Sequence, residues 1–194
     1  MRGAIIAAGE GSRLRADGFR VPKPLVEVAG VPLIGAVLRN FTAAGITAIT
    51  IIVNEREREC VEWVRTRFPA LEIDFIVKTT ASSLESFREV TGRGPAGPLL
   101  VSTVDAWCAA EDFTRFAAAA ASRPDEATVL AVTPFVSDEK PLWVTLGAGG
   151  RVEALGQVDS GLVTAGVYRV SDRARRLAPG RELGRLREYL GWLH

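Results

Sequence analysis

Residues 4–34 read AIIAAGEGSRLRADGFRVPKPLVEVAGVPLI and place a glycine-rich loop directly after a short apolar run. The apolar run at 3–7 predicts a buried strand, because a continuous apolar segment of this length suits a strand that is covered on both faces. Gly9 and Gly11 let the loop backbone approach a phosphate group with its N–H groups pointing toward it. The third glycine of a Rossmann fingerprint is replaced by Leu14, and the Gly-Lys-Ser/Thr of a P-loop is absent. A tight turn between strand and loop is the alternative explanation of the two glycines.

Alternating strand and helix patterns continue as far as residue 133. Apolar and β-branched runs predict the strands, and periodic apolar faces predict the helices between them. The expected strands are 46–53, 71–77, 99–104 and 127–133, and the expected helices are 33–44, 55–68, 83–90 and 109–122. The charged start of the second of these helices, Glu-Arg-Glu-Arg-Glu at 55–59, predicts a solvent-exposed face. Beyond residue 133, strand-like segments at 143–146, 152–155 and 162–170 precede a stripe of leucines between 183 and 193.

This order of elements predicts an α/β fold. We expect a Rossmann-like, mostly parallel sheet with helices on both faces, forming a single domain over residues 1–194. Ligands of such sheets bind beyond the carboxyl ends of the strands. The residues that follow the first and fourth of these parallel strands are therefore the first candidates for a functional site.

Composition excludes several classes of function. The 194 residues carry 24 Lys and Arg against 23 Asp and Glu, and the resulting charge of +1 does not suit a globally basic nucleic-acid binder. The one histidine is the last residue, so histidine acid–base chemistry, a Ser-His-Asp triad and histidine-ligated metals are not expected. Cys60 and Cys108 fit no zinc or Cys-x-x-Cys spacing, and no apolar run is long enough to cross a membrane. We therefore expect a cytoplasmic protein that binds neither nucleic acid nor membrane.

Two charged residues stand out by their positions. Lys23 is one of only three lysines and lies between Pro22 and Pro24. Prolines fix the local backbone and lower the entropic cost of holding the lysine ammonium in place, although an exposed loop lysine is the alternative. Asp105 follows an apolar strand, where an unpaired carboxylate would be costly. A functional role for Asp105 is compatible with its capping the next helix.

The combined motif of the first 34 residues resembles the signature of a known family. It has the form A-A-G-x-G-[ST]-R-[LM] at 7–14, P-K-[PA]-[LM] at 22–25 and G-x-P-[LM]-[IL] at 30–34. The chain thereby resembles the sugar-phosphate nucleotidyltransferases, also called NDP-sugar pyrophosphorylases, and the resemblance extends more loosely to about residue 170.

A later segment indicates a branch within that family. Residues 78–84, KTTASSL, are similar to the segment in which the family contacts the base and ribose. Their form resembles most closely the branch that contains phosphocholine cytidylyltransferases and uncharacterised sugar nucleotidyltransferases. The molybdenum-cofactor guanylyltransferases are more distant, because their loop has Gly-Gly before the Arg and Asp before the Lys.

The resemblance implies the nucleotide-diphospho-sugar transferase type of α/β fold and a transfer reaction. A phosphate oxygen of a small acceptor, either a sugar 1-phosphate or a phosphocholine-like molecule, would attack the α-phosphorus of a nucleoside triphosphate, and pyrophosphate would leave. Such an in-line displacement needs positioned cations and Mg²⁺, not a histidine. The implied nucleotide-binding residues are Ala7, Ala8, Gly9, Gly11, Ser12, Thr80, Ala81 and Ser82.

The resemblance also implies residues for phosphate, metal and acceptor. Arg13 would grip the β- and γ-phosphates, and Lys23 would sit between the α-phosphate and the acceptor phosphate, which makes both of them catalytic. Asp105 would hold Mg²⁺, which prefers carboxylate and phosphate oxygens. Gln157 and Thr164 stand at acceptor-binding positions, where many members have Glu and sugar-specific members often have Asn. These two departures leave a small non-sugar phosphate or a phosphonate open as the acceptor.

The sequence departs from the family again near the metal site and at its end. Val104 stands before Asp105 where the family usually has Gly, and the second metal-binding carboxylate that the family carries beyond its last helix has no counterpart. The acidic residues after Tyr168 are expected to be solvated, namely Asp172, Glu182 and Glu188. The domain is therefore short at its C-terminus compared with the family.

This shortness has consequences for the last helix and for function. Its final apolar residues would have little to pack on, and we expect a partner, a homo-oligomer contact through this helix or a further segment to cover Leu190, Trp192 and Leu193. A catalytically weak, nucleotide-binding regulatory paralogue would fit the missing carboxylate and is the main alternative to an enzyme. A glycosyltransferase of the GT-A type is disfavoured, because it uses an Asp-x-Asp pair and the sequence has none.

Overall fold

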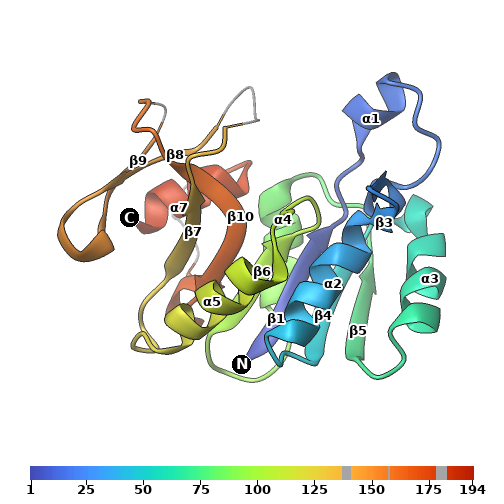
Figure 1. Cartoon of the computed structure of the whole chain (residues 1–194), viewed down its shortest axis with the longest axis horizontal. Helices are drawn as coiled ribbons and strands as arrows, with labels where there is room; N and C mark the ends of the chain where they lie inside the picture. Colours follow the sequence, from blue (N-terminus) through green and yellow to red (C-terminus); the bar gives the residue numbers. More distant parts are fainter. Residues whose placement is uncertain (137–140, 157, 178–182) are drawn as a thin grey trace.

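The fold is built on one mixed β-sheet of eight strands (Figure 1). The structure is a computed structural model that describes residues 1–136, 141–156, 158–177 and 183–194, without the side chain of Arg13. The strands follow the order β5-β4-β1-β6-β10-β8-β9, and β7 also pairs with β10. Four neighbouring strands are parallel: β1 (Arg2–Ala7), β4 (Ala48–Val53), β5 (Glu72–Val77) and β6 (Leu99–Thr103). They correspond to the strands predicted at 3–7, 46–53, 71–77 and 99–104.

The other half of the sheet is antiparallel. It contains β7 (Val129–Thr133), β8 (Trp143–Leu146), β9 (Val152–Gly156) and β10 (Val163–Val170). Strand β7 belongs to the alternating pattern that predicted parallel pairing, yet it pairs antiparallel with β10. The direction of pairing therefore changes between β6 and β7, before the sequence pattern changes after residue 133. A separate two-stranded hairpin, β2 (Glu27–Val28) with β3 (Val31–Pro32), lies near the glycine-rich loop in sequence and was not expected.

Helices cover both faces of the sheet, as the predicted α/β class requires (Figure 1). One face packs on α2 (Leu33–Ala43), α3 (Glu59–Arg67) and α5 (Ala110–Ala121), and the other packs on α4 (Ser83–Thr91), α6 (Asp172–Arg176) and α7 (Leu186–Leu193). Successive side chains of a strand point to opposite faces. In β1, Ile5 accordingly belongs to the core under α2, whereas Ala4 and Ile6 belong to the core under α4 and α7.

Local chemistry explains several helix boundaries. Helix α2 begins directly after Pro32, and Gly45, with φ of +72°, follows its end as predicted. Ser82 caps α4, because its side chain accepts a hydrogen bond of 3.1 Å from the backbone N–H of Glu85. Short helical elements were not predicted, namely α1 (Ser12–Ala16), directly after Gly11, and the 3₁₀ turns η1 (Lys23–Leu25) and η3 (Ala148–Gly150). The helix predicted over 55–68 is divided into the 3₁₀ turn η2 (Glu55–Glu57) and α3.

The last helix packs within the chain, which corrects the expectation that its apolar residues would lack partners. Leu190 is 3% exposed, and Trp192 and Leu193 pack against the same core. Tyr189 stacks on Trp192, and its hydroxyl shares its one proton between the backbone carbonyls of Ala174 and Leu177, which both lie within hydrogen-bond distance. The observation that suggested an oligomer contact through α7 is thereby removed. Among the described residues, no helix has the length and apolar character to span a membrane.

Candidate active site

Three strand ends meet beyond the carboxyl edge of the parallel strands, where α/β sheets bind ligands. The side-chain amide of Asn54, directly after β4, donates a long hydrogen bond of 3.5 Å to the carbonyl of Ala8, directly after β1. The carbonyl oxygen of the same side chain accepts a hydrogen bond of 3.3 Å from Thr79, which follows β5. Asn54 therefore joins the glycine-rich loop to the segment that was predicted to border the base.

The glycine-rich loop lies beyond the end of β1 and leads into α1 (Figure 1). Gly11 has φ of +59°, and a Cβ atom there would lie 3.0 Å from the Cβ of Lys23. Glycine is therefore needed at position 11 for both its backbone conformation and its closeness to Lys23. A Cβ atom at Gly9 would meet nothing within 4 Å, which leaves open space beside that part of the loop. Ser12 begins α1 and is exposed, and the side chain of Arg13 lies outside the described part of the chain.

Lys23 and Asp105 form the central charged pair of the site. The ammonium Nζ of Lys23 donates to Oδ2 of Asp105 at 2.5 Å, and the two side chains are 24% and 52% exposed. Partial burial alone would raise the pKa of Asp105, but the charge and hydrogen bond of Lys23, with a hydrogen bond from Thr103, hold that pKa below its ordinary value. Asp105 does not cap α5, whose N-cap is Ala109 without a side-chain hydrogen bond.

The residues predicted to border the base lie at the start of α4. The hydroxyls of Thr80 and Ser86 are hydrogen-bonded at 2.6 Å, and the backbone N–H of Ala81 donates to the carboxylate of Glu85 at 2.7 Å. Together with the Ser82 cap, these bonds fix the conformation of residues 80–82. Residues 80–82 form these hydrogen bonds with residues of α4. The contact of this segment with Asn54 comes from Thr79.

A large open cleft of about 1450 Å³ begins at Asp105 and extends over the antiparallel half of the sheet. Its polar residues include Thr164 and Tyr168 of β10 and Arg187 of α7, and its aromatic wall is formed by Trp107, Phe116 and Phe135. Gly166 lets β10 approach the end of β6, because a Cβ atom there would lie 2.6 Å from the Thr103 hydroxyl. Asp105 and Thr164 both line the cleft, and their roles in metal and acceptor binding stay predictions, whereas Gln157 lies outside the described residues.

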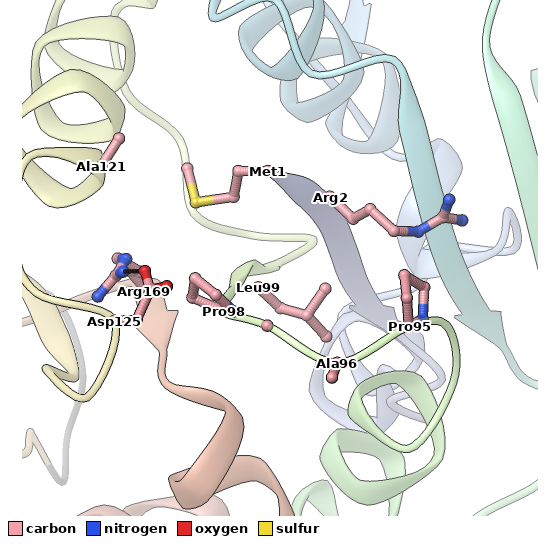
Figure 2. A pocket seen from close by; sticks show the side chains of 10 residues that line it. Met1, Arg2, Pro95, Ala96, Pro98, Leu99, Ala121, Asp125 and Arg169 are labelled. Carbon is pink, nitrogen blue, oxygen red and sulfur yellow. Dashed lines mark hydrogen bonds and ion pairs between the residues drawn. The ribbon is translucent and has the colours of Figure 1, made fainter.

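A second cavity lies at the opposite, amino ends of β1 and β6 and is less suited to a substrate (Figure 2). It measures about 440 Å³ and is lined by Met1, Leu99 and the charged pair of Arg169 and Asp125. The Arg169 guanidinium donates to Asp125 at 3.1 Å and to the carbonyls of Pro124 and Ala127. Its main donors are therefore already used within the protein.

The acidic residues after Tyr168, which were expected to be solvated, do not join Asp105 where the structure describes them. Asp172 pairs with Arg176 at 3.0 Å and accepts a hydrogen bond from the N–H of Gly97, and Glu188 accepts the N–H groups of residues 184 and 185 before α7. Glu182 lies outside the described residues. Within the described part of the chain, no three His, Cys, Asp or Glu side chains gather as a metal site.

Residues 55, 56, 58 and 59 are exposed as predicted, whereas Glu57 departs from the predicted solvated face. Its side chain is 2% exposed, and one carboxylate oxygen lies 3.8 Å from the guanidinium of Arg15 in α1. Neither Asn54 nor Glu57 was identified from the sequence. The position of Asn54 directly after a predicted buried strand was a usable signal, but nothing in the charged run distinguished Glu57 from its exposed neighbours.

Sequence comparisons with known proteins identify similar chains. The sequence model of the family described as MobA-like NTP transferase domain matches residues 3–177. A mannose-1-phosphate guanyltransferase of Kluyveromyces lactis is 38% identical over 99 residues, which is 51% of this chain and 25% of that protein. A 2-aminoethylphosphonate cytidylyltransferase of Lancefieldella rimae is 30% identical over 95 residues, which is 46% of this chain and 38% of that protein. The chain thus spans well under half the length of these curated relatives.

Solved structures establish the fold. The inositol-1-phosphate CTP transferase from T. maritima superimposes with a TM-score of 0.76 at 20% identity, covering 99% of this chain and 80% of that one. A UDP-glucose pyrophosphorylase complexed with UDP-glucose gives 0.75 at 12% identity, covering 100% and 87%. The predicted nucleotide-diphospho-sugar transferase type of fold is therefore confirmed.

Proposed function

Because the chain belongs to the MobA-like NTP transferase domain family, we propose that it transfers a nucleoside monophosphate from a nucleoside triphosphate to a small phosphate- or phosphonate-bearing acceptor and releases pyrophosphate. The observation that carries the proposal is the Lys23–Asp105 pair. It stands between a glycine-rich loop suited to phosphates and a cleft wide enough for an acceptor. The relatives whose names specify mannose 1-phosphate and 2-aminoethylphosphonate support an acceptor with an anionic phosphorus group.

The reaction is an in-line displacement at phosphorus. An oxygen of the acceptor forms a bond to the α-phosphorus, the bond from that phosphorus to the bridging oxygen breaks, and pyrophosphate leaves with the electron pair. The protein must hold two polyanions together and offset the charge that develops on the leaving group. In this proposal the backbone of residues 8–11 holds the nucleotide phosphates, Lys23 lies between the two substrates, and Arg13 binds the departing pyrophosphate.

Asp105 suits a shared magnesium site. Mg²⁺ in nucleotide-binding proteins is commonly held by one or two carboxylates together with substrate phosphates, and Asp105 is a half-exposed carboxylate at the mouth of the cleft. When bound, the metal would neutralise phosphate charge. Lys23 pairs with Asp105, so we expect its ammonium to turn toward the substrate phosphates as they bind. That exchange would free the carboxylate for the metal.

The acceptor is proposed to bind in the cleft beyond Asp105. Thr164 and Arg187 line it from β10 and α7, and an arginine there would complement an anionic phosphorus group. Gln157 is proposed as a further acceptor contact from its position in the sequence. The aromatic wall of the cleft offers an apolar surface to the remainder of a small acceptor.

The proposal is tested by pyrophosphate release across the four common nucleoside triphosphates with Mg²⁺. The acceptor panel contains mannose 1-phosphate, phosphocholine and 2-aminoethylphosphonate. Release that requires one nucleotide and one acceptor would support the proposal. Nucleotide binding without release from any pair would favour the regulatory paralogue, the alternative suggested by the missing counterpart of the family's second metal-binding carboxylate in the sequence.

A further inference from the structure

Glu57 is a buried acidic side chain that the proposed reaction does not use. It belongs to η2, directly after the end of β4, and is 1% exposed. Among the described residues, neither of its carboxylate oxygens completes a hydrogen bond. Burying a carboxylate without hydrogen bonds destabilises a fold, so the stability of the protein does not explain why an acid occupies this position.

The groups around Glu57 belong to the glycine-rich loop and its continuation. The guanidinium of Arg15 lies 3.8 Å from one carboxylate oxygen, slightly beyond hydrogen-bond distance. Burial raises the pKa of the Glu57 carboxyl, while the backbone N–H of Lys23 and the positive charges of Arg15 and Lys23 act to lower it. Glu57 therefore faces two cationic residues of the loop, one of them the proposed catalytic lysine.

The segment that carries Glu57 touches the loop at both ends. Asn54, at the start of η2, donates to the carbonyl of Ala8, where the loop leaves β1. Glu57, at the end of η2, faces Arg15 in α1 and the backbone of Lys23, both of which follow the glycines in the sequence. A rigid strand end thus contacts the loop on either side of the glycines that are proposed to hold phosphate.

We propose that Glu57 is a positioning residue of this site: its negative charge holds the Arg15 and Lys23 segments against the end of β4 and so sets the place of the Lys23 ammonium. The inference rests on the proposed function. A direct contact between Glu57 and a nucleotide phosphate is excluded by like charge, so its effect reaches the substrates through the two cations. An acid at this position therefore favours function at the expense of stability.

The test compares Glu57→Gln with the parent protein in three measurements. The amide keeps the shape of the side chain but removes its charge, so the midpoint of thermal unfolding is expected to stay equal or rise. Amide hydrogen exchange is expected to increase in residues 9–25 and to stay unchanged in β1 and β6. Turnover is expected to fall on the order of tenfold to a hundredfold, because a displacement of about 1 Å at a reacting centre has effects of that size.

Two further variants sharpen the test. Glu57→Asp keeps the charge with a shorter reach and is expected to recover part of the lost turnover. Glu59→Gln removes an exposed acid two residues away and is expected to match the parent protein in all three measurements. Recovery of turnover in Glu57→Asp would show that the reaction needs the negative charge at position 57 and not only the shape of the glutamate side chain.

Opposite results would overturn the inference. A lower unfolding midpoint for Glu57→Gln, with parental exchange in residues 9–25, would make Glu57 an ordinary structural residue. The exchange and unfolding measurements need no substrate. If the parent protein transfers nothing to any acceptor, the proposed function fails, while these two measurements still decide whether Glu57 holds the loop.

Discussion

The Lys23–Asp105 ion pair joins the loop after β1 to the end of β6, two places separated by 82 residues in the sequence. Both side chains keep contact with solvent, and pairs of this kind add little to stability. The ion pair matters because it fixes the position of Lys23, a lysine flanked by prolines, at the edge of the cleft where phosphates are proposed to meet. Lys23 and Asp105 could be singled out as site candidates from local sequence, whereas Glu57 could not, because its burial depends on a loop far upstream folding over it.

Lys23→Ala is expected to remove most activity without unfolding the protein. Turnover should fall by about 100-fold or more, because the ammonium offsets charge in the transition state. Stability should stay within about 1 kcal/mol of the parent protein, since Asp105 remains half exposed. Pyrophosphate release measures the change in turnover, and thermal unfolding measures the change in stability. Arg13→Ala should also lower turnover. Arg65→Ala, on the exposed face of α3, is the control. Near-parental turnover of Lys23→Ala would contradict the role of this residue.

The pKa of Asp105 predicts how the pair responds to acid. It is lower in the folded chain than the ordinary value of 3.8, so its ionisation stabilises the folded state above that value. The contribution is lost as the pH falls through the lowered pKa. We expect the difference in unfolding midpoint between the parent protein and Asp105→Asn to be constant from about pH 7 to about pH 5 and to shrink below about pH 4. A difference that already shrinks near neutral pH would mean that another group titrates.

Among the elements, the long strands and helices could be predicted and the short ones could not. Runs such as Ala48–Val53 and Leu99–Thr103 are apolar throughout, so their burial follows from composition. Helix α1 and turn η2 each span only a few residues and depend on contacts with one another, through Arg15 and Glu57. The sequence predicted helix α7 itself. It did not predict which elements pack against α7, because these include α4 and α6, which come from other parts of the sequence.

The cap of α4 is expected to contribute measurably to stability. Ser82→Ala removes the side-chain acceptor of the Glu85 N–H and should cost about 1 kcal/mol, or about 2–4 °C in the unfolding midpoint for a chain of this size. Ser122→Ala, at the exposed end of α5, is the matched control and should change the midpoint little. Equal midpoints for Ser82→Ala and the parent protein would show that water replaces the cap.

The packing of α7 predicts a larger loss of stability than the loss of the α4 cap. Leu190 is 3% exposed, so Leu190→Ala should lower the free energy of unfolding by about 2–5 kcal/mol, measured by urea denaturation. Leu193→Ala lies at the partly buried end of the same helix and should cost less. Similar losses from both variants, or no loss from Leu190→Ala, would contradict the observed packing.

Across the whole molecule, the two halves of the sheet carry two parts of the proposed reaction. The parallel half of the sheet ends in the glycine-rich loop and Asn54. The antiparallel half, together with α7, forms the cleft that Thr164 and Arg187 line. The alternating sequence pattern predicted the parallel half well. The order of β7 to β10 could not be predicted, because it depends on pairing between strands far apart in the chain, with a register shift between Thr164 and Tyr168.

The most direct test of the central claim is ³¹P nuclear magnetic resonance of the complete reaction with Mg²⁺, nucleoside triphosphate and acceptor. A nucleotidyltransferase forms pyrophosphate and a new phosphoanhydride between the acceptor and the α-phosphate in equal amounts. We predict these paired signals for at least one nucleotide and acceptor, and their loss in Lys23→Ala. Spectra that stay unchanged for every pair, or that show pyrophosphate with free nucleoside monophosphate in place of the joined product, would contradict the account.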